Sequence, residues 1–387
     1  MSGFAVKGWC PSALRPMASG DGLVIRLRTR GGRLSQAQAS HIADLSNRYG
    51  NGLIDLTGRA NLQIRGGTSE NHEALIEALA RLALVDADAE SESRRNILVA
   101  PFWREGDDIP SLAGELERAL ATRSLGLPEK FGFAVDCGTE RVLTQAPADI
   151  RIERDGDGRL LVRADGASEG RAVARDEAID AALALAEWFV ASGGVRRGRG
   201  RMAAHLASGA AHPDAIAAKA TPVPAAALPH PGLYTAGALV GLAFGQMRSE
   251  TLRFLAALAP GLRMTPWRMI LLEGVCEMPG HDAIVTRADN PLLRVSACIG
   301  APSCSQAHAP TRRLAAELAP HMSANERLHV SGCAKGCAHP GPSTITLVGT
   351  PSGLDLVRHG TARDRPALQG LVPKKILSDI GAFMGRG

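Results

Sequence analysis

Aromatic residues and long apolar runs are scarce in this sequence. Phe, Trp and Tyr together make up 4% of its 387 residues, and no apolar run approaches the roughly 18–20 residues that span a bilayer. The N-terminus also lacks the basic segment and apolar stretch of a secretory signal. We therefore predict a cytoplasmic protein without a membrane partner.

Charge of one sign is not in large excess either. The chain has 44 Lys and Arg against 39 Asp and Glu, a net charge of +5. Nucleic-acid binding normally needs a basic stripe together with aromatic platforms for the bases. The composition therefore argues against a nucleic-acid partner and leaves an acidic small molecule open as a ligand.

The length and overall composition of the chain predict a globular protein with two or more structural units. Hydrophobic residues make up 45% and charged residues 21%, and 387 residues exceed the roughly 250–300 at which a single core stops growing. Seven cysteines are present, of which four crowd between positions 298 and 337. In a cytosolic chain such crowding favours metal or redox chemistry over disulfides.

The first 85 residues alternate strand and helix patterns. LVIRLRTR, from Leu23, alternates its apolar positions as a half-buried strand does, and we interpret Arg26 and Arg28 as lying on its solvated face. A helix is predicted over 35–49, a strand interrupted near Gly58 over 51–67, and a second helix over 69–84. The next block, to residue 191, again alternates strands and helices.

A second copy of this arrangement follows residue 231. GALVGLAFGQM, a helix over 249–258 and APGLRMTPWRMILLEG repeat the order and spacing of GDGLVIRLRT, its helix and YGNGLIDLTGRANLQIRG. Self-similarity of two long units indicates a pseudo-symmetric duplication with a site between the halves. A resemblance of any two β-α-β units is the simpler alternative.

The Gly-, Arg- and Pro-rich segment between the copies is interpreted as a linker. Within it, GRGRMA at 198–203 has the letters of a dinucleotide fingerprint. It follows a helix and a GG turn, whereas that fingerprint needs a preceding strand. We reject a nucleotide site and expect electrons from a separate reductase or carrier.

The most informative stretch is a pair of cysteine motifs. Cys298 and Cys304 are separated by five residues, and Cys333 and Cys337 by three. Structural zinc sites normally use gaps of two to four residues within each pair, and all-thiolate ligation suits an iron-sulfur cluster. Structural zinc and four buried structural thiols remain as alternatives. Cys10, Cys137 and Cys276 have no local partner and are interpreted as small buried hydrophobes.

The paired motif resembles the cluster motif of the sulfite and nitrite reductase family. That resemblance implies a 4Fe-4S cluster held by Cys298, Cys304, Cys333 and Cys337, with Cys337 shared with sirohaem in the reductases. It implies an α+β fold of two pseudo-symmetric halves, each with a ferredoxin-like half-domain and a sulfite-reductase-like α+β domain. The implied divisions are 1–85, 86–195, a linker at 196–231, 232–290, and a cluster domain at 291–387.

The resemblance also assigns residues over the tetrapyrrole. LTGRANLQ resembles the family's arginine segment and assigns Arg59, SRRNIL assigns Arg95 and Asn96, and LPEKF assigns Lys130. These cations are expected to bind acidic side arms, and Arg59, Arg95 and Lys130 to stabilise developing negative charge. Two weaker candidates for substrate contact are Arg65, at a strand-loop junction, and Arg268, in MTPWR, as the corresponding basic residue of the second half.

One departure from the reductases is at Gly132, where their LPxKFK segment has a second lysine. This loss, with the N-terminal GWCPSALRPMASGDGLVIRLR, is similar to the precorrin-3B synthase family of the same superfamily. That resemblance implies oxygen-dependent hydroxylation of precorrin-3A with lactone formation in cobalamin biosynthesis. It also implies a mononuclear non-haem iron and an external, NADH-linked electron donor.

Two alternatives remain at this point. The first is a sirohaem-dependent sulfite or nitrite reductase, and the second is a zinc-stabilised binding module without catalysis. His308 and His339, near the cysteine motifs, are candidates for a second iron or for proton transfer, although a structural role is the simpler interpretation for each.

Overall fold

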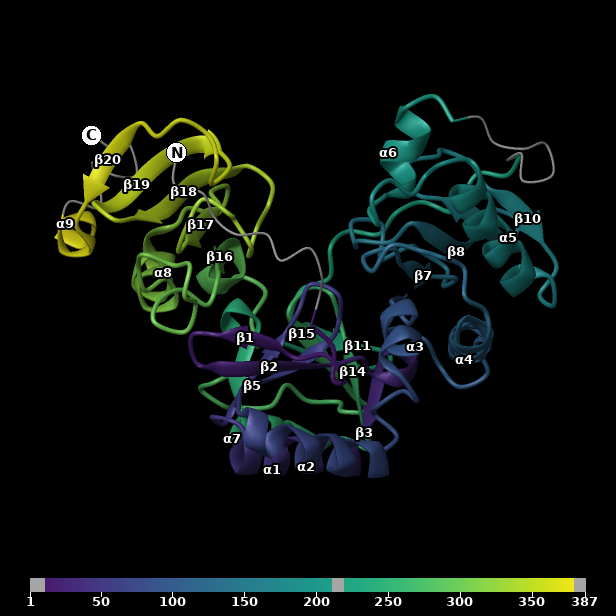
Figure 1. Cartoon of the computed structure of the whole chain (residues 1–387), viewed down its shortest axis with the longest axis horizontal. Coiled ribbons are helices and arrows are strands. Elements are labelled where there is room, and N and C mark those ends of the chain that lie inside the picture. Colours follow the sequence, from purple (N-terminus) through teal and green to yellow (C-terminus); the bar gives the residue numbers. More distant parts are fainter. Residues whose placement is uncertain (1–10, 211–218, 379–387) are drawn as a thin grey trace.

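The computed structural model describes residues 11–210 and 219–378, which form three lobes (Figure 1). Two interlocked five-stranded sheets and their helices form the lower lobe, and one α+β domain stands above each side of it. Most of the helices and strands predicted from the sequence are found, including helices over 36–49 and 249–258. Cys10 lies outside the described residues.

The two lower sheets exchange a strand. The first has the order β1-β2-β5-β4-β13 and the second β11-β12-β15-β14-β3. Their strands are β1 (Met17–Ser19), β2 (Gly22–Leu27), β4 (Leu53–Leu56), β5 (Leu62–Gly67), β13 (Gln246–Arg248), β11 (Gly232–Tyr234), β12 (Gly237–Gly241), β15 (Met269–Glu273), β14 (Gly261–Met264) and β3 (Arg33–Ser35). Each half thus gives the strand that precedes its first helix to the sheet of the other half.

Helices α1 (Gln36–Tyr49), α2 (Ser69–Arg81) and α7 (Ser249–Leu258) lie beneath these sheets (Figure 1). Helix α1 begins with a capping box, in which the Ser35 hydroxyl accepts from the Gln38 N–H and the Gln38 side chain accepts from the Ser35 N–H. The Thr68 hydroxyl caps α2 in the same position. Packing of α1 against α7 joins the two ferredoxin-like halves into one unit.

The two upper domains have the same strand order. The first contains β10-β9-β8-β7-β6 and the C-terminal one β20-β19-β18-β17-β16. In each, three parallel strands are followed by two antiparallel ones. Their strands are β6 (Ile97–Val99), β7 (Phe133–Val135), β8 (Ile150–Arg154), β9 (Leu160–Ala164), β10 (Arg171–Val173), β16 (Val295–Ala297), β17 (Leu328–Ser331), β18 (Ser343–Thr350), β19 (Gly353–Gly360) and β20 (Leu368–Leu371).

The helices of these two domains differ in size. The first domain has α3 (Ala89–Arg94), α4 (Asp108–Thr122), α5 (Ala178–Ala191) and α6 (Met202–Ala207), and the C-terminal domain has α8 (Arg312–Leu318) and α9 (Pro373–Ser378). Within the described residues, no helix has the length and apolarity that crossing a bilayer requires.

The hydrophobic core is divided unequally. One continuous cluster of buried residues runs from Ala13 to Ile284 and joins the lower lobe to the first α+β domain. The C-terminal domain has its own core, from Val295 to Ile376. Polar contacts therefore contribute much of what fixes the C-terminal domain against the rest.

Part of the predicted linker is bound to the first α+β domain. Residues 220–225 pair with three positions of the first α+β domain, Arg141, Asp155 and Gly170. The segment before them forms a hairpin and α6, while residues 211–218 of the linker lie outside the described residues. The linker therefore contributes structure to the domain that it leaves.

Candidate functional site

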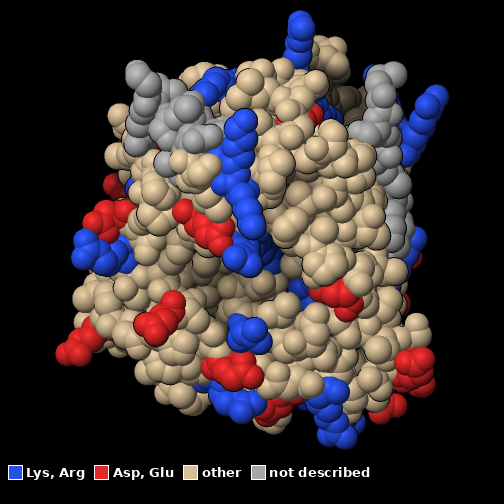
Figure 2. All heavy atoms as spheres, turned by 90° about the vertical axis from the view of Figure 1, so that its left-hand side faces the viewer, with Lys and Arg blue, Asp and Glu red and all other residues tan. Residues whose placement is uncertain are grey.

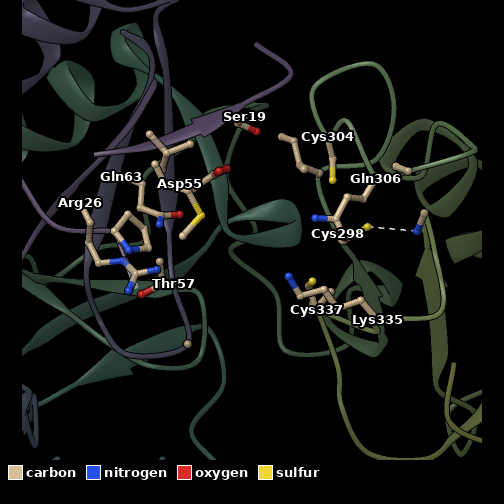
Figure 3. A pocket seen from close by; sticks show the side chains of 18 of the residues that line it. Ser19, Arg26, Asp55, Thr57, Gln63, Cys298, Cys304, Gln306, Lys335 and Cys337 are labelled. Atoms are coloured by element: carbon tan, nitrogen blue, oxygen red, sulfur yellow. Dashed lines mark hydrogen bonds between the residues drawn. The ribbon is translucent and has the colours of Figure 1, made fainter. Parts of the chain in front are cut away.

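A cavity of about 730 Å³ lies where the three lobes meet. Its floor comes from β2, β4 and β5 of the lower lobe, one wall from residues 128–130 and 198–201 of the first α+β domain, and the facing wall from the cysteine motifs. Figure 3 shows Arg26, Gln63 and Thr57 on one side and Cys298, Cys304 and Cys337 on the other.

All four cysteines of the paired motif line this cavity. Cys298 directly follows β16, and one residue, Gly332, separates Cys333 from the end of β17. Cys298, Cys304 and Cys333 are partly buried, and Cys337 is the most exposed of the four, open to the cavity. Cys337 therefore faces the space in which a large ligand would lie.

The turns that carry these cysteines need glycine. Gly300 and Gly336 have φ values of +69° and +66°, a region that favours glycine. A Cβ atom on Gly300 would lie 2.6 Å from the Thr311 Oγ1 atom, so the chain passes too close for any side chain. Gly332, which directly precedes Cys333, donates its N–H to the Cys298 sulfur at 3.2 Å. Backbone donors to sulfur are one means by which a protein tunes an iron-sulfur cluster.

The thiols of the second pair need compensation to ionise. Burial raises the pKa of Cys333 and of Cys337, while the Lys335 ammonium acts in the opposite direction on both. Thiolate ligands are required by metals, and a bound metal supplies the stabilisation that burial withdraws. Lys335 also lines the cavity.

The donor set of the site is four thiols. They line one cavity, and all-thiolate ligation suits a 4Fe-4S cluster, in which each thiolate binds a different iron. Among residues 11–210 and 219–378, no three His, Cys, Asp or Glu side chains stand close enough together to hold one metal ion.

The remaining cavity lining is strongly cationic. Among the described residues, eight Lys and Arg line the cavity against two carboxylates, an excess of six, whereas the whole chain has an excess of only five. The basic residues are Arg26, Arg65, Lys130, Arg199, Arg201, Arg268, Arg312 and Lys335, and the acidic residues are Asp55 and Glu129. By contrast, basic and acidic side chains are interspersed on the face seen in Figure 2, where basic ones stand at the edge of a hollow. The cavity is thus where positive charge is concentrated.

Several of these cations are held by protein carboxylates. Asp55 accepts from Arg65 at 3.1 Å and from Arg312 at 3.2 Å, which links the lower lobe to the C-terminal domain. Arg65 also binds Asp21 at 2.6 Å. The predicted residue Arg65 therefore lies at the cavity, where its guanidinium is already engaged in ion pairs.

The other predicted basic residues are distributed between the cavity and the protein interior. Lys130 lines the cavity, and its carbonyl accepts from the half-buried Arg59 at 3.2 Å. Arg95 is buried instead, with its guanidinium on Asp86 at 2.8 Å, and Asn96 donates to the Glu129 carbonyl at 2.8 Å. Neither Arg95 nor Asn96 is among the residues lining the cavity, so the structure gives both an internal role.

The sheet register shows which residue of the first half has the position of Arg268. In the register of the two sheets, Leu56 and Leu62 correspond to Met264 and Ile270. Counting between these pairs matches Arg268 to Ala60, and both residues have positive φ, 61° and 55°. Arg268 lines the cavity, donates to the Ala338 carbonyl at 2.7 Å, and has its pKa lowered by burial and by Arg312.

The solvated-face interpretation of β2 is wrong. Arg26 lines the cavity, and Arg28 is buried against Glu92 at 3.6 Å. Cys137 is buried as predicted, but Cys276 is exposed. His308 and His339 are not among the residues lining the cavity, and the His339 Nε2 atom lies 3.2 Å from the Pro342 carbonyl.

Sequence reasoning missed the cations at 199 and 201. They lie in the segment interpreted as a linker, in which the only motif considered was a dinucleotide-binding fingerprint. Its repeated Gly-Arg pattern after a buried helix was the available signal, because glycines allow a tight hairpin and arginines bind anions.

Comparisons with known proteins agree with this architecture. Residues 15–82 match the family model described as the nitrite/sulfite reductase ferredoxin-like half domain. A solved structure of the Mycobacterium tuberculosis NirA protein has a similar fold, with a TM-score of 0.63 and 17% identity over 92% of this chain and 79% of that chain.

Curated relatives are found in both branches of the superfamily. A precorrin-3B synthase of a Sinorhizobium species is 30% identical over 93% of this chain and 84% of its own length. A ferredoxin–nitrite reductase of Synechococcus elongatus is 31% identical over 34% of this chain and 28% of its own length. A sulfite reductase [NADPH] hemoprotein beta-component of Chromohalobacter salexigens is 30% identical over 33% and 22%.

Proposed function

The chain belongs to the precorrin-3B synthase family, an oxidoreductase branch of the nitrite and sulfite reductase superfamily, and we propose that it hydroxylates precorrin-3A with dioxygen. The proposed reaction consumes one dioxygen, two electrons and two protons per precorrin-3A. One oxygen atom enters the product, in which a ring acetate closes a lactone, and the other leaves as water. The observation that carries the proposal is that the four cysteine sulfurs and eight cations line one cavity.

The cysteines are proposed as ligands of a 4Fe-4S cluster. When bound, the cluster supplies electrons to the reaction centre one at a time, from an external donor. The chain's own contribution is to bring Cys298, Cys304, Cys333 and Cys337 to one wall, with the Gly332 N–H on the Cys298 sulfur.

The cations are proposed to bind and orient the substrate. Precorrin-3A has several carboxylate side arms, and arginine binds a carboxylate through two parallel hydrogen bonds. The carboxylate of Asp55, which would otherwise repel such a ligand, is neutralised by Arg65 and Arg312. The cavity therefore presents net positive charge on the sides that surround the ring.

Residue 132 argues against the sirohaem reductase alternative. The reductases have a second lysine at this position, and Gly132 offers no active-site ammonium. A Cβ atom on Gly132 would lie 3.1 Å from the Asn96 carbonyl oxygen and 3.6 Å from the Arg59 Nη1 atom. The alternative predicts a sirohaem absorption band and six-electron reduction of sulfite or nitrite.

The test is turnover of precorrin-3A by anaerobically purified enzyme, reduced with dithionite and then exposed to ¹⁸O₂. We expect a product that contains one atom of ¹⁸O, as measured by mass spectrometry, and none when ¹⁸O is supplied in water alone. Label from water in place of dioxygen would contradict the proposal. A sirohaem band together with sulfite reduction would establish the alternative.

The Cys337→Ser variant tests the cluster part separately. We expect it to lose the cluster's optical and electron-paramagnetic signals, because an alcohol is a poor ligand for iron in such a cluster. Exposed Cys276, which lies outside the cavity lining, provides the matched control. The Cys276→Ser variant should retain both signals, and loss in both variants would point to a general effect on folding.

A further inference from the structure

A tight hairpin projects from the first α+β domain into the cavity wall. The N–H and carbonyl groups of Arg196 and Arg199 bond to each other at 2.7 and 3.0 Å. Between them, Arg197 and Gly198 have φ values of 51° and 70°, the pattern of a two-residue turn with both central residues left-handed. A left-handed arginine is unfavourable, so the surroundings must fix this turn.

Close packing anchors the base of the hairpin. A Cβ atom on Gly200 would lie 2.1 Å from the Gly194 carbonyl oxygen, and one on Gly194 would lie 2.3 Å from the Phe189 ring. Phe189 is fully buried in α5. The two strands of the hairpin are therefore pressed against each other and against the domain core, which leaves the backbone of Arg199 little freedom.

Lys130 lies on the same wall and is held in a similar way. Its carbonyl accepts from the Arg59 Nη2 atom at 3.2 Å and from the Arg201 Nη1 atom at 3.4 Å. Arg201 in turn binds the fully buried carboxylate of Asp149 at 2.9 Å. The backbone at Lys130 is thus fixed, while its side chain is exposed to the cavity.

The two side chains are left available for a ligand. Lys130 and Arg199 both line the cavity, and both are exposed. Within the part of the chain that the structure describes, neither side chain makes a hydrogen bond or ion pair, unlike Arg65, Arg201 and Arg312. The fixed backbone sets where the two charges can reach, and neither charge has to leave a protein carboxylate before it binds an external anion. The remaining entropic cost is the rotamer freedom that each side chain loses on binding.

We propose that Lys130 and Arg199, here called the Lys130–Arg199 pair, bind a carboxylate side arm of the acidic tetrapyrrole. This assignment rests on the proposed function and extends it to a residue of the linker. The pair stands on the wall that faces the cysteines, so it fixes the edge of the ring that lies farthest from them. Arg197, on the same hairpin, is exposed but does not line the cavity, and therefore serves as a matched control.

The experiment measures binding of uroporphyrin, a fluorescent octacarboxylate, to the full-length holoprotein under anaerobic conditions and at low salt. We expect Arg199→Gln to raise the Kd about tenfold, which corresponds to about 1.4 kcal/mol, because a charge-assisted hydrogen bond is lost. Arg197→Gln should leave the Kd within about twofold, and Arg199→Lys should restore part of the affinity. Deuteroporphyrin, with two carboxylates, should show a smaller difference between wild type and Arg199→Gln.

Each outcome separates the two proposals. Equal Kd values for Arg199→Gln and Arg197→Gln would overturn the Lys130–Arg199 pair and leave the proposed function in place, provided that wild type binds uroporphyrin. Absence of uroporphyrin binding by wild type would overturn both, because the cavity would then not accept an acidic tetrapyrrole.

Discussion

The first α+β domain and the C-terminal α+β domain have the same order and direction of strands but different residues at the ends of those strands. Val99 pairs with Val135 in the first, and Ala297 with Val330 in the second. The residue after each of these strands then donates its N–H to the carbonyl of the paired valine. Ala100 donates to Val135 in the first domain, and Cys298 donates to Val330 in the second. Ala100 therefore occupies the position of Cys298.

The same register matches Gly138 to Cys333. The first domain thus lacks a sulfur at two of the four positions, and it supplies the cavity with Lys130 and Arg199 instead. The comparison teaches that one scaffold serves two roles around one cavity. The C-terminal copy presents the four cysteines together with Arg312 and Lys335, and the described part of the first copy presents Lys130, Arg199 and Arg201 without a cysteine.

The largest effect is expected when the two copies are made alike. The Cys298→Ala variant gives the C-terminal domain the residue of the first domain, and we expect it to lose the cluster because one of four ligands is removed. The measurement is iron and acid-labile sulfide per chain. The reciprocal Ala100→Cys variant should retain wild-type content, and if Cys298→Ala retains it as well, Cys298 is not a ligand.

The two domains also differ in how they are joined to the lower lobe, since the first shares its core and the C-terminal one does not. The Asp55→Asn variant leaves Arg65 and Arg312 without their shared carboxylate, and we expect a loss of about 3 kcal/mol, as when a buried ion pair is broken. The three described tryptophans, at 103, 188 and 267, lie outside the C-terminal domain. Cluster absorbance therefore reports unfolding of the C-terminal domain, and tryptophan fluorescence reports unfolding of the rest. In the Asp55→Asn variant, the loss of cluster absorbance should occur at a lower urea concentration than the change in fluorescence.

The exposed ion pair between Arg287 and Asp289, at 2.7 Å, provides the control. Asp289→Asn should change stability by less than about 1 kcal/mol, because solvent screens such a pair. Equal effects of Asp55→Asn and Asp289→Asn would show that the Asp55 contacts do not fix the C-terminal domain.

The domains should respond to pH in opposite directions. Burial raises the pKa of Asp136 in the first domain to about 6, from 3.8, so the stability contributed by its neutral form is present at low pH and lost as the pH rises to about 6. Burial, together with His339 and Arg268, lowers the pKa of His329 in the C-terminal domain from 6.5 to about 4. Its contribution is present above pH 6.5 and lost as the pH falls to about 4.

Each contribution amounts to roughly 3 kcal/mol. The register matches Asp136 to Ser331 and His329 to Ala134, so each group is unique to its copy. The measurement is the free energy of unfolding of Asp136→Asn and His329→Ala between pH 4 and 7, relative to wild type. The first variant should gain relative stability as the pH rises, and the second should gain it as the pH falls. Parallel profiles for both variants would contradict this assignment.

The sequence was sufficient for features set by local pattern. The helices over 36–49 and 249–258, the interrupted strand around Gly58 and the two turns that carry the cysteines follow from periodicity, caps and glycines within a few residues. The duplication was visible because both copies keep the same spacing. The paired cysteines were visible because their motifs are short and contiguous.

Features set by distant contacts were not predictable. Strands β3 and β13 have three residues each, and their exchange between sheets depends on partners about 190–230 residues away. Arg28 and Arg95 are buried only because Glu92 and Asp86 reach them in the folded chain. The hairpin that carries Arg199 is a different case, because its contact between Gly200 and Gly194 is local. It was missed because the Gly-, Arg- and Pro-rich composition of the segment was interpreted as a linker.

The most direct test of the central claim is the content of the C-terminal site. Protein purified without oxygen should contain about four acid-labile sulfides and at least about four irons per chain and, after reduction, should show the electron-paramagnetic signal of a 4Fe-4S cluster. One zinc per chain, with neither iron nor sulfide, would contradict it.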